Sequence, residues 1–331
     1  MEEKIKITLA KQTLELLKKD CEDFKILKQN GEINFNNFIN LLIDNYYEQF
    51  TAKEESLHDD INSAITIVPD YYKEKVFGEV VKLFSKQSYP ITDKHGSTTF
   101  SFKPTKVSEK AISYINQIIL KDESISSFYR RMFTAYSKAT KTEREKIIHK
   151  GNYEILKKAI KKNVQVCIVL NSKDVLSTCS IFTIAASKDE LFNYILVYNG
   201  KQNYTLRLAS IHSVSILSTK ASMPKENQML FERQVACAAQ YPMYNTDNEP
   251  IKVQLSEKGK KLFNKIYLYR PTPVSIEGDI YTFNCSANQL LYYFERFGDS
   301  ALILSPKRLG IFMRNYYYFA LKKYKSRYNG N

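Results

Sequence analysis

The fold is decided near the C-terminus by the stretch FGDSALILSP, residues 297–306. Its Phe-Gly-Asp ends one helix, its apolar run is a short strand, and Ser305-Pro306 supplies an N-cap and the first position of another helix. The flanking residues alternate between strand and helix patterns. They predict strands at 251–256, 266–270, 279–285 and 301–304, and helices at 257–264, 287–297 and 306–324. This βαββαβ succession is ferredoxin-like, and the long aromatic last helix is a candidate dimer arm.

Upstream of this unit the apolar period changes from 3.6 to 2. Asn199-Gly200 is the strongest hairpin signal in the chain. Five short strands within about 55 residues are typical of a small SH3-like or Sm-like β-barrel. They are expected at 164–170, 180–184, 193–198, 204–208 and 211–216.

Both regions resemble the WYL-domain regulators. The chain resembles the C-terminal extension of that family in one succession of features: Phe297-Gly298-Asp299, a short strand, Pro306 and a helix. Asn193-Tyr194-Ile195 stands where the family has Trp-Tyr-Leu, and Leu206-Arg207-Leu208 where it has Phe-Arg-Leu. Ser210 replaces the second arginine of that motif, so the match to the family's ligand pocket is incomplete. The resemblance implies a WYL barrel followed by a dimerisation domain.

The N-terminus begins with a strictly alternating strand, residues 4–9, followed by two helix patterns separated by Asn30-Gly31. A unit of about 50 residues is too small to bury a strand that has no partner within it. Two copies of the unit that pair their strands antiparallel would bury both strands. The segment resembles a ribbon-helix-helix dimer. The alternative is that the strand joins a sheet elsewhere in the chain. The resemblance implies that the strand's polar residues face nucleic acid and the start of the second helix holds phosphate: Lys4, Lys6 and Thr8, with Asn34 and Asn36.

Residues 51–163 predict a mainly helical linker region, with helices near 71–84 and from 108 onward and a strand at 97–102. Lysines and arginines crowd its polar positions. Two interpretations stay open, a solvated face and a phosphate-facing groove. The cations concerned include Arg130, Arg131, Lys138, Lys141 and Arg144.

The charge balance favours polyanionic partners. Lysine and arginine number 49 against 35 acidic residues, a net charge of +14. A lysine-rich composition alone would give the same excess. Aromatic residues interleaved with lysines suit base stacking beside phosphate contacts. On and beside the five strands, the candidate nucleic-acid-binding set is Lys161, Lys162, Tyr194, Tyr198, Lys201, Arg207 and His212.

Other function classes find little support. The sequence has no Gly-rich phosphate loop, no carboxylates at metal-binding spacing and no Ser-His-Asp or Cys-His arrangement, so we expect neither an enzyme nor a cofactor. Five scattered cysteines predict free thiols in a reducing cytoplasm. No apolar run approaches the ~18 residues that span a bilayer.

The expected class is α+β, and the sequence leaves three functions open. A WYL protein that begins with a ribbon-helix-helix resembles the accessory WYL proteins of type VI-D CRISPR systems. That resemblance implies a homodimer that binds single-stranded RNA and stimulates the RNA-targeting effector nuclease. The alternatives are a DNA-binding repressor with an effector-sensing barrel and, third, a nuclease. The expected domains are a ribbon-helix-helix at 1–50, the linker at 51–163, the WYL barrel at 164–220 and the dimerisation domain at 221–331.

Overall fold

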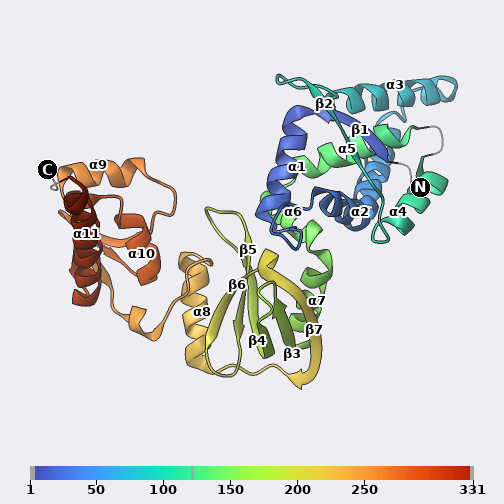
Figure 1. Ribbon diagram of the computed structural model, residues 1–331. Helices are drawn as coiled ribbons and strands as arrows, with labels where there is room; N and C mark the ends of the chain where they lie inside the picture. Colours follow the sequence, from blue (N-terminus) through green and yellow to red (C-terminus); the bar gives the residue numbers. More distant parts are fainter. Residues whose placement is uncertain (1–3, 121–122, 329–331) are drawn as a thin grey trace. The chain divides into compact units, whose positions relative to one another are not determined.

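The structure is a computed structural model that describes residues 4–120 and 123–328 (Figure 1). The chain divides into two compact units between Tyr153 and Glu154. The division falls inside helix α7 (Lys150–Lys162), within the segment expected to be a helical linker.

The first unit is mainly helical with one small sheet. Its last helix, α7, runs on into the second unit. The earlier elements are β1 (Ile5–Ala10), α1 (Lys11–Asp23), α2 (Phe35–Ala64), α3 (Asp70–Ser88), β2 (Ser97–Phe102), α4 (Glu109–Tyr114), the π-helical turn η1 (Ile115–Ile119), α5 (Ile125–Lys138) and α6 (Lys141–Ile148).

The N-terminal strand pairs within its own chain. β1 runs antiparallel to β2, with Ile5 opposite Phe102 and Leu9 opposite Thr98. Helix α5 packs against β1, and Ile7 and Leu9 are fully buried. As expected, the strand has no partner within residues 1–50, but its partner comes from later in the same chain, so a second copy is not needed to complete the pair. The alternative, a strand that joins a sheet elsewhere in the chain, is confirmed, because the strand expected at 97–102 supplies the partner.

The second unit begins with five antiparallel strands. They are β3 (Val164–Leu170), β4 (Val175–Ala186), β5 (Asn193–Tyr198), β6 (Asn203–Arg207) and β7 (Ile211–Lys220), with the short turn η2 (Leu208–Ser210) before β7. The sheet order is β6-β5-β4-β3-β7, so β6 and β7 are its edges. Within the described residues no pairing of β6 with β7 closes the sheet into a barrel. Helix α8 (Lys225–Cys237) packs against β4.

The rest of the second unit is a four-stranded sheet with helices. Its elements are η3 (Asn245–Asn248), β8 (Ile251–Leu255), α9 (Glu257–Lys265), β9 (Pro273–Glu277), β10 (Ile280–Phe283), α10 (Ala287–Phe294), η4 (Gly298–Ser300), β11 (Ala301–Ser305) and α11 (Lys307–Tyr328). The antiparallel order is β11-β8-β10-β9, so β10 lies between the first two strands of the βαββαβ succession. The aromatic core includes Phe263, Phe283 and Phe294.

One strand of this sheet lies later in the chain than expected. Residues 266–270 form a turn, and the second strand is β9. Tyr269 has a φ of 64°, which no strand residue adopts. The Tyr293 hydroxyl donates to the Ile266 carbonyl (2.6 Å) and Arg270 donates to the Phe263 carbonyl (3.1 Å), so these hydrogen bonds hold the turn against the core.

Across residues 4–120 and 123–328, none of the helices combines the length and the apolar character that crossing a bilayer requires.

Candidate nucleic-acid interface

The polar face of the β1–β2 ribbon carries the first group of expected contacts. Lys4 and Lys6 are exposed, and the Thr8 hydroxyl hydrogen-bonds the Thr99 hydroxyl at 2.8 Å. Lys6 pairs with Ser101 across the ribbon. Because opposite residues of an antiparallel pair share a face, two lysines and three hydroxyls lie together on one side of the ribbon.

The asparagines at the start of α2 serve the fold. Asn34 caps the helix as expected, accepting from the Asn37 amide at 3.1 Å. Asn36 donates to the Lys103 carbonyl (3.0 Å) and accepts from the Lys103 amide (2.8 Å). Both polar groups of the Asn36 side chain are thus used to tie α2 to the end of β2. Asn36, which was expected near phosphate, therefore has a structural role at the end of β2.

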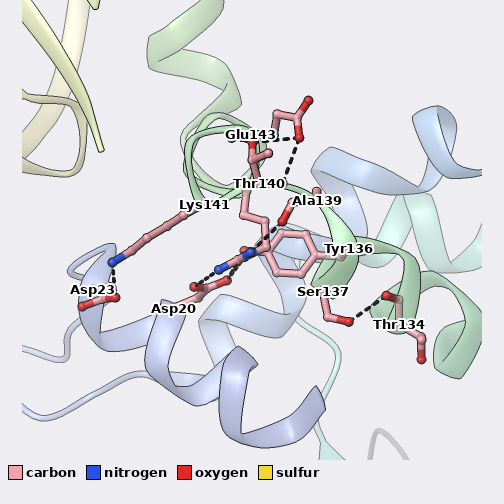
Figure 2. A network of polar contacts seen from close by, with 10 residues as sticks. Asp20, Asp23, Thr134, Tyr136, Ser137, Ala139, Thr140, Lys141 and Glu143 are labelled. Atoms are coloured by element: carbon pink, nitrogen blue, oxygen red, sulfur yellow. Dashed lines mark hydrogen bonds and ion pairs between the residues drawn. The ribbon is translucent and has the colours of Figure 1, made fainter. Parts of the chain in front are cut away.

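A buried ion pair joins α1 to α6 in the first unit (Figure 2). Asp20 is 1% exposed and accepts from Arg144 Nε (2.6 Å), Arg144 Nη2 (3.1 Å) and the Tyr136 hydroxyl (3.0 Å). Arg144 Nη1 donates to the Ala139 carbonyl at 2.7 Å. Burial, and then the Asp20 charge, raise the pKa of Tyr136 well above its usual value. Arg144 was expected on a polar surface, but it neutralises a buried carboxylate instead.

Two more cations of the helical region are engaged in ion pairs. Arg131 bridges Glu54 and Glu123, each at 2.5 Å, and it lies over the Phe50 ring. Burial raises the pKa of Glu54, although Arg131 opposes the shift. Lys141 lies 2.7 Å from Asp23 (Figure 2). These contacts do not fit a phosphate-facing groove, because carboxylates already neutralise the cations.

In the second unit, Tyr194 and Arg207 form a directly opposed pair on β5 and β6. The Arg207 guanidinium stacks on the Phe192 ring, 3.2 Å from its centroid. The Tyr194 hydroxyl donates to Glu190 at 2.7 Å. Burial, and then the Glu190 charge, also raise the pKa of the nearby Tyr241. Tyr194 and Arg207 are therefore neighbours in the sheet, as members of the expected nucleic-acid-binding set, but Tyr194 contacts the acidic turn at Glu190, which disfavours phosphate.

Tyr198 and Lys201 lie at the other end of this strand pair, in the β5–β6 hairpin. Gly200 has a φ of 89°, the left-handed conformation expected for the glycine of an Asn-Gly turn. Asn199 accepts from the amides of Lys201 (3.0 Å) and Gln202 (2.9 Å), and the Tyr198 hydroxyl donates to the Gly200 carbonyl (2.8 Å). Lys201 is exposed on a backbone that these bonds hold in place.

Lys161 and Lys162 lie at the C-terminal end of α7 and are exposed. With Lys158 they occupy one helix face, since residues three and four apart are neighbours. β3 follows directly, and its first residue, Val164, pairs with Lys220 at the end of β7. Several cations therefore gather at this end of the sheet.

His212 does not join this group. It is exposed at the start of β7, beside Ile211, which pairs with Leu170 at the far end of β3. The length of β3 separates it from Lys161 and Lys162 by roughly 20 Å, at about 3.3 Å per residue.

Sequence reasoning missed a cavity beside edge strand β6. Its volume is about 490 Å³, and its walls come from the hairpin, α8 and the loop after α8. Only Lys201 was expected among its residues. The others come from segments whose proximity has no local sequence signal, including Asn203, Tyr204, Asn227 and Tyr244.

All five cysteines are free thiols. Among residues 4–120 and 123–328, no three His, Cys, Asp or Glu side chains cluster closely enough to hold a metal ion.

Comparison with known proteins relates this chain to solved structures alone. No protein-family model matches the sequence, and no curated protein matches it either. The proteasome accessory factor B/C of Arthrobacter aurescens is 14% identical, with a TM-score of 0.24 over 68% of this chain and 37% of its own, which is too weak to carry an argument. The crystal structure of a CRISPR Cas-related protein is 19% identical, with a TM-score of 0.67, and covers 99% of this chain and 95% of its own. The whole chain therefore has the fold of that CRISPR Cas-related protein.

Proposed function

We propose that this protein is a nucleic-acid-binding accessory that binds single-stranded RNA and stimulates an RNA-targeting type VI-D CRISPR effector nuclease. The observation that carries the proposal is the fold shared, from end to end, with a CRISPR Cas-related protein. The WYL-like motif positions within the same chain point in the same direction. In this proposal the protein is not an enzyme, and it acts by holding the single-stranded RNA.

The charge distribution of the second unit supports RNA binding. Lys158, Lys161 and Lys162 project from one face of α7, and Lys201 projects from the hairpin. Lysines that neutralise phosphates release condensed counterions, and this release drives binding without reading sequence. Aromatic side chains beside them can stack on unpaired bases.

The proposal also assigns the parts of the second unit. We take the five-stranded sheet as the WYL domain and the four-stranded sheet as a ferredoxin-like dimerisation domain. Helix α11 supports the second assignment, because Phe312, Tyr316 and Phe319 lie on one helix face and are 56%, 46% and 61% exposed. A second copy of this chain would cover that face. We expect Phe319→Lys to convert a dimer into a monomer in analytical ultracentrifugation, whereas a wild-type monomer would remove this part of the proposal.

The direct test measures binding by fluorescence anisotropy. Labelled single-stranded RNA, single-stranded DNA and duplex DNA are titrated with the protein at 50 and 200 mM salt. For about five phosphate contacts on a single strand, affinity should fall roughly 100-fold between these salts, and about 20-fold if two contacts are lost. We expect the Lys161→Ala/Lys162→Ala variant to show the smaller slope.

A matched variant controls for net charge. Lys75 and Lys86 are exposed lysines of α3 in the first unit. Lys75→Ala/Lys86→Ala removes the same charge and should keep the wild-type slope. Weak RNA binding that does not respond to salt would refute the proposal.

Stimulation is tested separately. Cleavage of a target RNA by the effector nuclease is timed with and without the protein, with a guide RNA present. We expect faster cleavage with the wild type and a smaller gain with Lys161→Ala/Lys162→Ala. A cleavage rate that the wild-type protein leaves unchanged would reject the accessory role even if RNA is bound.

One observation favours the alternative, a DNA-binding repressor. The major groove admits a two-stranded β-ribbon, and the β1–β2 ribbon presents Lys4, Lys6 and Thr8 on one polar face. The same titrations decide between the two functions. Preference for duplex DNA, lost in Lys4→Ala/Lys6→Ala and kept in Lys161→Ala/Lys162→Ala, would make this protein a repressor.

A further inference from the structure

We infer that the cavity beside edge strand β6 is a nucleotide-binding subsite that receives one unpaired adenosine of the bound strand. The inference rests on the proposed RNA-binding function and adds a location and a base preference to it. The cavity volume of about 490 Å³ lies in the range of 300 to 1,000 Å³ typical of small-molecule sites.

The cavity wall opposite β-strand β6 is held in place by a buried side-chain amide. Gln234 of α8 is 2% exposed and donates to the Thr205 hydroxyl of β6 (2.8 Å) and to the Ala239 carbonyl (2.6 Å). It therefore ties the edge strand to the turn that follows α8. Beyond that turn, Tyr244 donates its amide to Asp247 at 3.0 Å, so the loop that carries the Tyr244 ring is also held.

The chemistry of the lining suits a nucleotide. Leu230 and Met243 provide an apolar base, at 8% and 3% exposure. Tyr204 comes from the strand and Tyr244 from the loop, and Tyr244 is 53% exposed. Lys201 stands on the rigid hairpin at the same cavity. In a nucleotide site, a cation binds the phosphate, an aromatic ring stacks on the face of the base, and a side-chain amide hydrogen-bonds the edge of the base.

A pair of asparagines suggests which base is preferred. Asn227 Nδ2 donates to Asn203 Oδ1 (3.0 Å), and Asn203 Nδ2 donates to the Asn227 carbonyl (3.2 Å). An amide has two donor hydrogens and an oxygen with two lone pairs, so these bonds orient Asn227 and leave it a donor and an acceptor for a ligand. Asparagine pairs in this bidentate way with adenine N6 and N7.

The test compares labelled RNA 12-mers of adenine and of uracil with the full-length protein. We expect the wild type to bind the adenine strand more tightly, and Asn227→Ala to reduce this preference by about 5- to 20-fold. Tyr244→Ala should weaken binding about 5- to 30-fold through lost stacking, whereas Tyr244→Phe keeps the ring and should bind like the wild type.

The control is Tyr267→Ala, since Tyr267 is 74% exposed and outside the cavity. Thermal unfolding of every variant verifies the fold. If the wild type binds RNA and the Tyr244 and Asn227 variants behave like Tyr267→Ala, the subsite is wrong and the proposed function stands. Equal affinity of the wild type for the two strands would also overturn the adenosine assignment. If the wild type binds neither strand, the proposed function itself fails.

Discussion

Replacing Arg144 with methionine should strongly destabilise the first unit. The variant keeps most of the side-chain volume but removes two of the three donors around Asp20. What remains is a carboxylate at 1% exposure with the Tyr136 hydroxyl as its donor in this network. Breaking a buried ion pair by removing one partner costs about 3–5 kcal/mol, because the other charge stays buried.

The magnitude can be expressed as a melting temperature. For a unit of about 150 residues, each kcal/mol corresponds to about 2–4 °C, so the first unit should melt roughly 6–20 °C lower. The chain has no tryptophan, so the assay is far-UV circular dichroism with differential scanning calorimetry. Lys86→Met, which removes an exposed cation from α3, is the matched control and should change little.

A second variant separates charge from shape. Asp20→Leu with Arg144→Met replaces both charges by apolar groups, which is often neutral or stabilising for a buried pair. Tyr136 then loses its acceptor, at about 1–3 kcal/mol, and adding Tyr136→Phe should restore that part. The reasoning is refuted if Arg144→Met melts within about 2 °C of Lys86→Met, or if the double variant is less stable than the single one.

Three other expectations can be measured with the same material. Gly259→Ala should destabilise the four-stranded unit, because the new Cβ would collide with the Ser300 carbonyl, whereas Gly78→Ala meets open space in a helix and should stabilise by up to ~1 kcal/mol in urea melts. Burial raises the pKa of Tyr46 to about 12. The neutral phenol therefore contributes fully to the free energy of unfolding below the unfolded-state pKa of about 10, and this contribution is lost as the pH rises through 12. Melting temperatures measured across a pH series should decline above pH ~10, and a flat profile would contradict this expectation. Under native conditions a thiol reagent should label at most two of the five cysteines quickly. The other three, Cys21, Cys179 and Cys285, are buried and have raised thiol pKa values. Rapid labelling of all five would disprove this burial.

Local patterns predicted most of the elements of this protein. Alternation placed the five strands of the second unit, Asn199-Gly200 placed their hairpin, and Asn34 marked the start of α2. Each of these signals is carried by adjacent residues and needs no knowledge of the partner. The turn at 266–270 was misread as a strand because its apolar content fits both, and a left-handed Tyr269 has no sequence signature.

Partners were harder to predict than elements. The sequence gives no indication that residues 5–10 pair with 97–102, because strand register depends on the surrounding tertiary packing. Charge position was equally hidden, since Arg144 and Lys161 both lie in lysine-rich helical stretches but Arg144 is the one that pairs with the buried carboxylate of Asp20. The cavity beside β6 needs three segments at once, so no single stretch of sequence could have revealed it.

The β1–β2 ribbon also sets the order of events during synthesis of the chain. Thr8 leaves the ribosome 91 residues before its partner Thr99. At about 5–20 residues per second, the N-terminal strand waits roughly 5–20 s for the strand that completes its sheet. During that time Ile7 and Leu9, which end fully buried, have only the emerging helices to cover them. The small sheet of the first unit is therefore completed only after most of that unit has been synthesised.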